Sequence, residues 1–314
     1  MIAASVERKA VRSTPRRVLV VGFRRLAQPL AARLTNDAWS CNYSESGGTL
    51  ASITSDIVYQ VGGGPIVYPR LLAASRAAGT PVIKHWVGTD VLRTVLPHVR
   101  KQYLANKVNH WAVTQWLADE LRAAGLGIEA KVVPLSVLQQ TEPKPLPPPP
   151  LTIVIYAPAS KWAFYRGPLM LAIAEKFPDV RFLVVAHDGT GVTATPNVSF
   201  LGYRSDMAEI YARSHAVLRF VDHDGLSYMV MEAMEAGRHV IWDRPMRGVR
   251  LIADVPGIER EIAALDRELR AGVLEQNEEG RAYTRATYLD SLVADQIRQE
   301  FEAVSDAGAR KRRA

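Results

Sequence analysis

The residues best suited to chemistry lie together in the stretch Leu218–Gly237, which reads LRFVDHDGLSYMVMEAMEAG. Two acids in it, Asp224 and Glu232, have seven residues between them. Along a helix this spacing corresponds to at most about 12 Å, close to the reach of a diphosphate with a sugar at each end. The pattern indicates a sugar-diphosphate site. The same spacing also fits a helix-capping acid followed by a structural ion pair.

The elements that must position these acids are a strand and the helix after it. The apolar run Ala216–Val221 predicts a buried parallel strand, and Leu226–Ala236 predicts a helix. A helix that begins just after a strand presents unpaired N–H groups and partial positive charge, which suit an anion. Gly225 would let the backbone approach it closely. Glu232 lies on an otherwise apolar helix, so its charge needs a polar partner.

The segment DGLSYMVMEAMEAG resembles the Glu-x7-Glu signature of glycosyltransferase family 4, a family of retaining enzymes with the GT-B fold. The resemblance implies that Asp224 lies near the donor sugar and that Glu232 holds the donor ribose. It also implies that Gly225, Leu226 and Ser227 meet the donor diphosphate. The sequence departs from the signature in two places, because Asp224 replaces a glutamate and Ser227 replaces a glycine.

The resemblance extends to two catalytic candidates in the first half of the chain. The segment HWVGTDVL is similar to the family element whose histidine faces the donor sugar and the acceptor, which points to His85 and Asp90. Both lie at the carboxyl end of a predicted strand, Pro81–Val87, where open α/β sheets bind ligands. A core histidine and a capping aspartate explain the same residues equally well.

Other candidate donor contacts lie in loops that follow predicted strands. Arg166 matches a family Lys-Gly position and, with Lys161, would neutralise the leaving diphosphate; an ordinary exposed basic loop is the alternative. The turn with Tyr203 and Arg204 resembles the one that faces the nucleobase. A glycine run follows the strand Asp56–Val61 and would leave room for a ligand in the cleft, or simply form a tight turn. Its members are Gly62, Gly63 and Gly64.

The length of 314 residues predicts two domains. Six prolines in TEPKPLPPPP, at 141–150, favour a semi-rigid linker between them. The fold class we expect is α/β: a GT-B protein with two Rossmann-like α/β/α domains that face an interdomain cleft. The predicted parts are an acceptor-side domain at 16–142, a linker at 143–150, a nucleotide-sugar domain at 151–284, a C-terminal helix at 285–306 that crosses back to the first domain, and basic tails at 1–15 and 307–314.

The composition limits the partners. The net charge is +7, but the excess lies in the two tails, so the body lacks the basic, aromatic-rich face of a nucleic-acid-binding protein. The tails could associate weakly with an anionic membrane. No apolar run reaches the length of a membrane span, and no signal peptide is evident, which predicts a cytoplasmic protein. The single cysteine, Cys41, excludes an internal disulfide.

These inferences predict a retaining glycosyltransferase that moves a sugar from a nucleotide-diphosphate sugar, most simply a UDP- or GDP-sugar, to an acceptor hydroxyl of unknown identity. We expect no cofactor and no metal, because no metal-ligand cluster is visible in the sequence. Two alternatives use the same fold: a sugar-nucleotide epimerase or phosphorylase, and a catalytically silent sugar-nucleotide-binding protein. The fold alone does not separate them.

Overall fold

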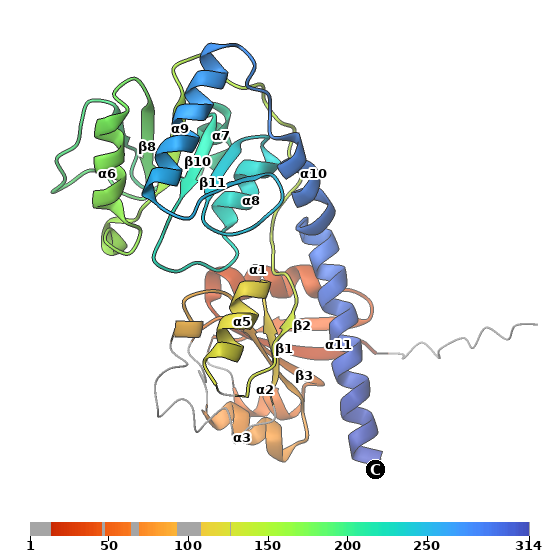
Figure 1. Cartoon of the computed structure of the whole chain (residues 1–314). Helices are drawn as coiled ribbons and strands as arrows, with labels where there is room; N and C mark the ends of the chain where they lie inside the picture. The colour runs from red at the N-terminus through yellow and green to blue at the C-terminus, as the bar shows by residue number, and fades with distance from the viewer. Residues whose placement is uncertain (1–13, 46–47, 64–68, 93–107, 126, 314) are drawn as a thin grey trace, which may run out of the picture. The chain divides into compact units, whose positions relative to one another are not determined.

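The computed structural model describes residues 14–313 apart from 46–47, 64–68, 93–107 and 126. The described chain forms two compact units, the first made of residues 1–135 and 291–314 and the second of residues 136–290. Each is a parallel α/β unit with its own six-stranded sheet (Figure 1). The expected α/β class is confirmed. The division falls before the proline-rich segment, which belongs entirely to the second unit.

The sheet of the first unit has the strand order β2-β1-β3-β4-β5-β6. Its strands are β1 (Arg16–Gly22), β2 (Trp39–Tyr43), β3 (Ile57–Val61), β4 (Val82–Trp86), β5 (Asn109–Ala112) and β6 (Lys131–Val132). Its helices are α1 (Arg24–Leu34), α2 (Thr49–Ile53), α3 (Pro69–Ala77), α5 (Gln115–Ala123) and the long α11 (Asp290–Arg313), which begins one residue before this unit's second stretch. Strands β3 and β4 are buried at every position, so their polar residues Gln60, Lys84 and His85 are buried too.

The end of the chain differs from the predicted one. Helix α11 continues to Arg313, so the expected basic tail from residue 307 is helical over that length. Residues 291–314 group with the first unit. Phe301 anchors α11 there, with ring centroids 5.2 Å from Tyr59 and 5.4 Å from Trp39. The N-terminal tail at 1–15 lies almost wholly outside the described residues.

The sheet of the second unit has the order β9-β8-β7-β10-β11-β12. Its strands are β7 (Thr152–Tyr156), β8 (Arg181–Val185), β9 (Val198–Phe200), β10 (Ala216–Arg219), β11 (His239–Trp242) and β12 (Val249–Leu251). Its helices are α6 (Gly167–Lys176), α7 (Met207–Ala212), α8 (Tyr228–Glu235), α9 (Val255–Arg270) and α10 (Glu278–Thr287), with a short 3-10 turn η2 (Ala159–Lys161). The chain order reverses between β7 and β10, so the ligand crevice of such a sheet lies at their carboxyl ends.

One hydrophobic core lies between this sheet and helices α6 and α9 (Figure 1). Alternate strand residues supply it: Ile153 and Ile155 from β7, and Ala216 and Leu218 from β10. Helix α8 contacts β10 and β11 with a face of buried methionines. The sheet is therefore covered on both faces, and α8 is fixed with its N-terminus at the crevice.

Residues 136–145 run as an extended segment that is tied to α8 and α10 by one acid. Glu235, whose side chain is 1% exposed, accepts from the Nε of Arg285 at 3.0 Å and from its Nη2 at 2.9 Å. The same carboxylate accepts the backbone N–H of Thr141 at 2.9 Å. Arg285 also donates to the Thr141 carbonyl at 2.6 Å. Glu235 was not among the predicted functional residues, and it is a structural anchor.

Candidate functional site

A cavity of about 390 Å³ lies at the carboxyl edge of the second sheet, at its topological switch point. Parts of its wall come from the switch-point strands and the helix after β10: Tyr156 at the end of β7, Arg219 at the end of β10, and Tyr228, Met229 and Glu232 of α8. Asp224, Leu226 and Ser227 line it from the β10–α8 loop. The site predicted around Leu218–Gly237 is thus brought together around one cavity.

Helix α8 begins two residues later than predicted, at Tyr228, and Ser227 is its N-cap residue. The Ser227 side chain makes no capping hydrogen bond. The N–H groups of the first turn have no helical acceptor, so the cavity contains a helix N-terminus of the kind that binds anions. Gly225 is buried in the loop.

Asp224 is not an isolated carboxylate. It forms a bidentate ion pair with Arg219, with Nε to Oδ2 at 2.7 Å and Nη2 to Oδ1 at 2.9 Å. Both side chains are below 10% exposed and both line the cavity. The guanidinium also lies 4.9 Å from the centre of the Tyr165 ring. Burial disfavours the charged form of Arg219, but the hydrogen bond and the charge of Asp224 outweigh it and raise the pKa of Arg219.

Sequence reasoning missed Arg219, and a signal for it was present. An arginine within the apolar run AVLRFV of a buried strand must be neutralised inside the protein. Asp224 follows five residues later, at the strand's carboxyl edge, and is the acid placed to do so.

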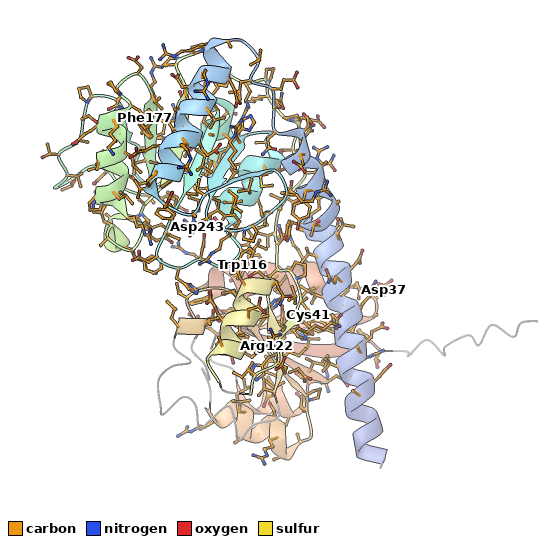
Figure 2. The ribbon with its side chains drawn as sticks, in the orientation of Figure 1. Asp37, Cys41, Trp116, Arg122, Phe177 and Asp243 are labelled. Atoms are coloured by element: carbon orange, nitrogen blue, oxygen red, sulfur yellow. The ribbon has the colours of Figure 1, made fainter. Side chains whose placement is uncertain are left out.

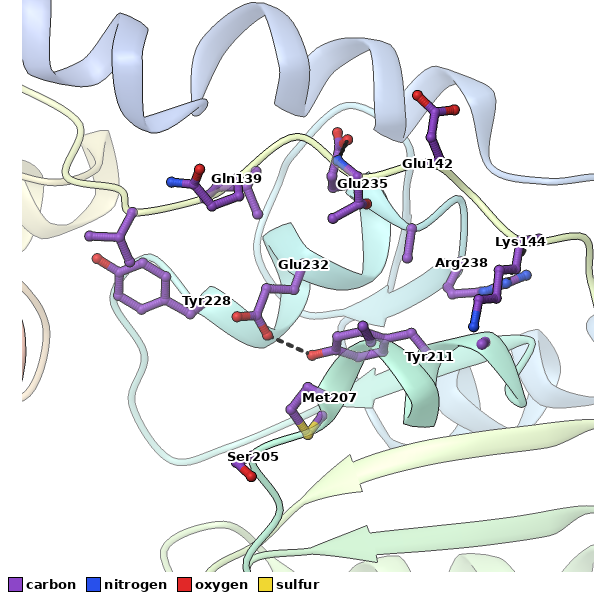
Figure 3. A pocket seen from close by; sticks show the side chains of 16 residues that line it. Gln139, Glu142, Lys144, Ser205, Met207, Tyr211, Tyr228, Glu232, Glu235 and Arg238 are labelled. Carbon is purple, nitrogen blue, oxygen red and sulfur yellow. Dashed lines mark hydrogen bonds between the residues drawn. The ribbon is translucent and has the colours of Figure 1, made fainter.

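Glu232 points from the second turn of α8 toward Tyr211 of α7, whose hydroxyl donates to its Oε2 at 2.9 Å (Figure 3). Burial raises the pKa of the Glu232 carboxyl, and the hydrogen bond from Tyr211 partly offsets this. The polar partner that the sequence demanded is therefore a tyrosine. Glu232 retains a second oxygen for a hydroxylated ligand, since its side chain is only partly buried.

The predicted nucleobase turn also lines the cavity. Tyr203 is 81% exposed, which is unusual for a tyrosine, and Arg204 pairs with Asp206 at its rim. Ala186, which also lines the cavity, has a positive φ of 70°. Its N–H donates to the carbonyl of Gly202 at 2.7 Å, which holds the β8 end against this turn. A non-glycine residue in this conformation costs about 1 kcal/mol or more, and such strain clusters at binding sites.

The two predicted diphosphate cations do not line this cavity. Arg166 has a left-handed conformation, with φ 52°, and its Nε donates to Asp222 Oδ1 at 2.9 Å. Its guanidinium also lies 4.1 Å from the Phe220 ring centre. Lys161 is exposed on η2, with its ammonium 6.0 Å from the Phe164 ring centre. Both lie on the β7–α6 loop, which Asp222 joins to the β10–α8 loop.

His85 occupies the core of the first unit rather than a cavity. It is completely buried, the Tyr59 hydroxyl lies 2.7 Å from Nδ1, and the Val133 carbonyl lies 2.8 Å from Nε2. Burial lowers the pKa of His85 to about 3. Because both ring nitrogens are engaged and solvent is excluded, the structure does not support the predicted catalytic role. The alternative of a satisfied core histidine describes it.

Asp90 likewise closes its own loop. One carboxylate oxygen accepts the N–H groups of Val87 at 3.1 Å and Gly88 at 2.9 Å. The other pairs with Lys84 at 2.9 Å, with both side chains at most 3% exposed. This buried pair fully explains Asp90, so its predicted catalytic role has no geometric support. Lys84 was missed by sequence reasoning.

The glycine run is explained by packing where it is described. Gly62 and Gly63 have positive φ values of 59° and 79°. A Cβ atom on Gly62 would lie 2.7 Å from the Phe23 ring. Lys84 donates to the Gly62 carbonyl at 2.6 Å. Gly64 lies outside the described residues. These contacts favour the tight-turn interpretation for the first two glycines.

Cys41 is buried in β2 of the first unit (Figure 2), and burial raises its pKa to about 12. Such a thiol is not a nucleophile at neutral pH.

Across the described ranges, no three His, Cys, Asp or Glu side chains are grouped so that they could hold a metal ion. The described helices include none with the length and apolar character of a membrane span.

No protein-family model matches this sequence, and no curated protein sequence matches it. Solved structures do match the fold. HepE of Anabaena, solved in complex with UDP-glucose, has a TM-score of 0.68 and 14% identity over 91% of this chain and 99% of HepE. The lipopolysaccharide outer core galactosyltransferase WaaB has a TM-score of 0.65 and 13% identity over 90% of this chain and 98% of WaaB.

A third match, TarM, has a TM-score of 0.60 and 13% identity over 78% of this chain and 54% of TarM. Together with the two parallel six-stranded sheets, these matches define the fold as GT-B. At 13–14% identity the likeness concerns the fold, and function has to be argued from the site.

Proposed function

We propose that this protein is a glycosyltransferase that moves a sugar from a nucleoside diphosphate sugar to an acceptor hydroxyl, with retention of configuration and without a metal ion. One observation carries the proposal: the switch-point cavity of a GT-B unit contains a helix N-terminus flanked by Asp224 and Glu232. That N-terminus suits the diphosphate, Glu232 the ribose, and the Asp224 side the sugar.

The charges near the cavity support this assignment. When the bond from the anomeric carbon to the diphosphate breaks, negative charge develops on the leaving oxygen, while the acceptor oxygen bonds to the anomeric carbon and passes its proton to the leaving diphosphate. The N–H groups at the α8 N-terminus place partial positive charge in the cavity wall, whereas the charge of Arg219 is paired with Asp224. Lys161 and Arg166 lie on the neighbouring β7–α6 loop and do not line the cavity. In this arrangement positive charge from the protein, rather than a metal ion, would stabilise the leaving group.

A UDP-sugar is the donor to test first, because HepE was solved with UDP-glucose. We expect UDP to raise the melting temperature more than GDP or ADP, equally with and without EDTA. A ligand present at 100 times its dissociation constant adds about 2.7 kcal/mol to the free energy of unfolding. Absence of a shift with all three nucleotides would reject the nucleotide-sugar site. A shift that EDTA abolishes and Mg²⁺ restores would reject metal independence.

Glu232 provides a second test, because the ribose does not change during transfer. We expect Glu232→Ala to raise the donor KM by about tenfold or more with kcat little changed, as for loss of binding shared by ground and transition states. Tyr211→Phe is the matched control, since it removes the hydroxyl that orients Glu232 but leaves the carboxylate. Steady-state kinetics against donor concentration would measure both. A loss confined to kcat would contradict the ribose assignment.

The pairing of Asp224 with Arg219 favours one alternative, a silent sugar-nucleotide-binding protein. A carboxylate that is already neutralised has less charge to offer a developing cation. Tight binding of UDP-glucose without release of UDP, measured over a panel of acceptors, would support that alternative.

A further inference from the structure

Helix α2 of the first unit presents its large apolar side chains outward. Its sequence is TLASI, and the residue that it buries is Ser52, whose hydroxyl donates to the Thr49 carbonyl at 2.7 Å. Leu50 is instead 72% exposed, and Ile53 is 46% exposed. A surface helix normally buries its apolar residues and exposes its polar ones. This reversed pattern points to contact with something outside the unit.

Helix α3 packs beside α2 and adds positive charge (Figure 1). Leu71 is buried in the core of the first unit and fixes this helix there. Arg70, Ala73 and Ala77 lie on one exposed stripe of α3, at positions i, i+3 and i+7, and Arg76 is exposed beside it. The outer side of α3 therefore consists of small side chains flanked by arginines.

The sheet topology places both helices on one surface. Strands β2, β1, β3 and β4 are parallel neighbours in that order, α2 joins β2 to β3, and α3 joins β3 to β4. Right-handed connections that run in the same direction across a sheet lie on the same face. Leu50 and Arg70 are each the second residue of their helix, so they lie at the same end of this helix layer. We call the surface formed by Leu50, Ile53, Arg70, Ala73, Arg76 and Ala77 the α2–α3 face.

The α2–α3 face combines positive charge with a lack of acids. Neither helix sequence, TLASI or PRLLAASRA, contains an aspartate or a glutamate. The nearest acids in the chain lie outside the helices: Glu45 precedes α2, and Asp56 follows it and accepts the Arg17 N–H at 2.8 Å. An apolar surface with arginines and without acids is complementary to the anionic headgroups and apolar chains at a membrane surface.

We propose that the α2–α3 face docks this protein on an anionic lipid bilayer, with Leu50 and Ile53 inserted among the headgroups and the arginines on lipid phosphates. A second copy of the chain fits less well, because a two-fold interface brings a patch against itself and would oppose its arginines. Two large apolar side chains also fall short of the roughly 800 Å² that each partner buries in a stable interface. The proposal uses residues outside the basic tails and the donor cavity, so it is independent of the proposed function.

The first test measures binding of the full chain to lipid vesicles by cosedimentation. We expect binding to vesicles of phosphatidylglycerol mixed with phosphatidylcholine, and much weaker binding to phosphatidylcholine alone. The double variant Leu50→Ser with Ile53→Ser should bind the anionic vesicles about tenfold or more weakly, because the apolar contact is lost while the basic tails are unchanged. Arg70→Gln should weaken binding by about fivefold.

Two exposed residues of the second unit supply matched controls. Leu251 is 57% exposed and Arg181 is also exposed, so Leu251→Ser and Arg181→Gln make the same chemical changes elsewhere and should bind like the wild type. Unchanged binding of the double variant would assign membrane binding to the basic tails and overturn the proposal. Equal binding to both kinds of vesicle would overturn the assignment to an anionic bilayer, and binding to neither would reject docking altogether.

A fluorescent label tests insertion directly. In Leu50→Cys the new thiol is exposed, whereas Cys41 is buried and its pKa is raised to about 12, so only the new thiol should react with an NBD maleimide. Emission from this label should shift to the blue when anionic vesicles are added, and nitroxide-bearing lipids should quench it. The same label on Leu251→Cys should not respond. Unchanged emission from the Leu50→Cys label would contradict insertion.

Sedimentation velocity without lipid tests the competing occupant. If the wild type self-associates and the double variant is monomeric, the α2–α3 face is an interface between two copies and the membrane proposal is wrong. UDP should raise the melting temperature of the double variant as much as that of the wild type, because the donor cavity lies in the second unit. Failure of the docking proposal can therefore be distinguished from failure of the proposed function.

Discussion

Asp224→Asn is expected to lower kcat for sugar transfer by an order of magnitude or more, and to destabilise the second unit at the same time. Catalysis should fall because the carboxylate faces the cavity where the sugar is expected and would stabilise a developing oxocarbenium-like centre. Stability should fall because the change leaves Arg219 buried without its counter-ion. Breaking one partner of a buried pair costs about 3–5 kcal/mol.

A double variant separates these two effects. Arg219→Met with Asp224→Leu removes both charges, and such replacements in a buried pair are often close to neutral for stability. We expect its melting temperature to return toward the wild-type value while kcat stays low. Initial rates and thermal unfolding would be measured on the same preparations. If activity returned together with stability, Asp224 would be a structural residue and the proposed division of roles between the two acids would be wrong.

Among changes at residues outside the donor cavity, Arg285→Met should give the largest loss of stability. It leaves Glu235 buried with only the Thr141 N–H as a partner, because both guanidinium contacts disappear. We expect a loss of about 3 kcal/mol, at the lower end of the range for a buried pair because Arg285 is itself 28% exposed. Chemical denaturation would measure the change in the free energy of unfolding.

Two comparisons make this prediction specific. Glu235→Gln should cost less, about 1 kcal/mol, since the amide oxygen can still accept from Thr141 and Arg285 can reach water. Arg270→Met breaks exposed ion pairs with Asp266 and Asp179 and should cost much less than Arg285→Met, because solvent screens exposed pairs. Similar losses for Arg285→Met and Arg270→Met would show that Glu235 is not the anchor of the 136–145 segment.

Contacts between distant parts of the chain also explain why the sequence alone suggested a catalytic role for His85. A histidine at the carboxyl end of a parallel strand lies where ligands bind, and nothing local in HWVGTDVL distinguishes a ligand-facing ring from a buried one. The partners that fix His85 come from Tyr59 and from the Val133 carbonyl, which lie on other strands or loops. Its burial is therefore a property of the assembled sheet.

The sequence by itself determined the features that depend on residues close to one another in the chain. Apolar runs marked the buried parallel strands, and the succession of strand, glycine turn and helix placed Asp224, Ser227 and Glu232 around a helix N-terminus. The near-continuous apolar patterns were enough for this, since a strand covered on both faces must be apolar throughout. The α/β class with two sheets followed from the same patterns and from the length.

Tertiary structure alone decided which charges pair and which face a cavity. Arg219 neutralises Asp224, Arg285 neutralises Glu235, and Arg238 keeps two nitrogens without partners. All three are arginines, yet the acids that pair with Arg219 and Arg285 lie 5 and 50 residues away, and Arg238 pairs with no acid in the described chain. Pairing depends on distances between side chains across elements, and chain order does not encode those distances before the sheet and its helices are assembled.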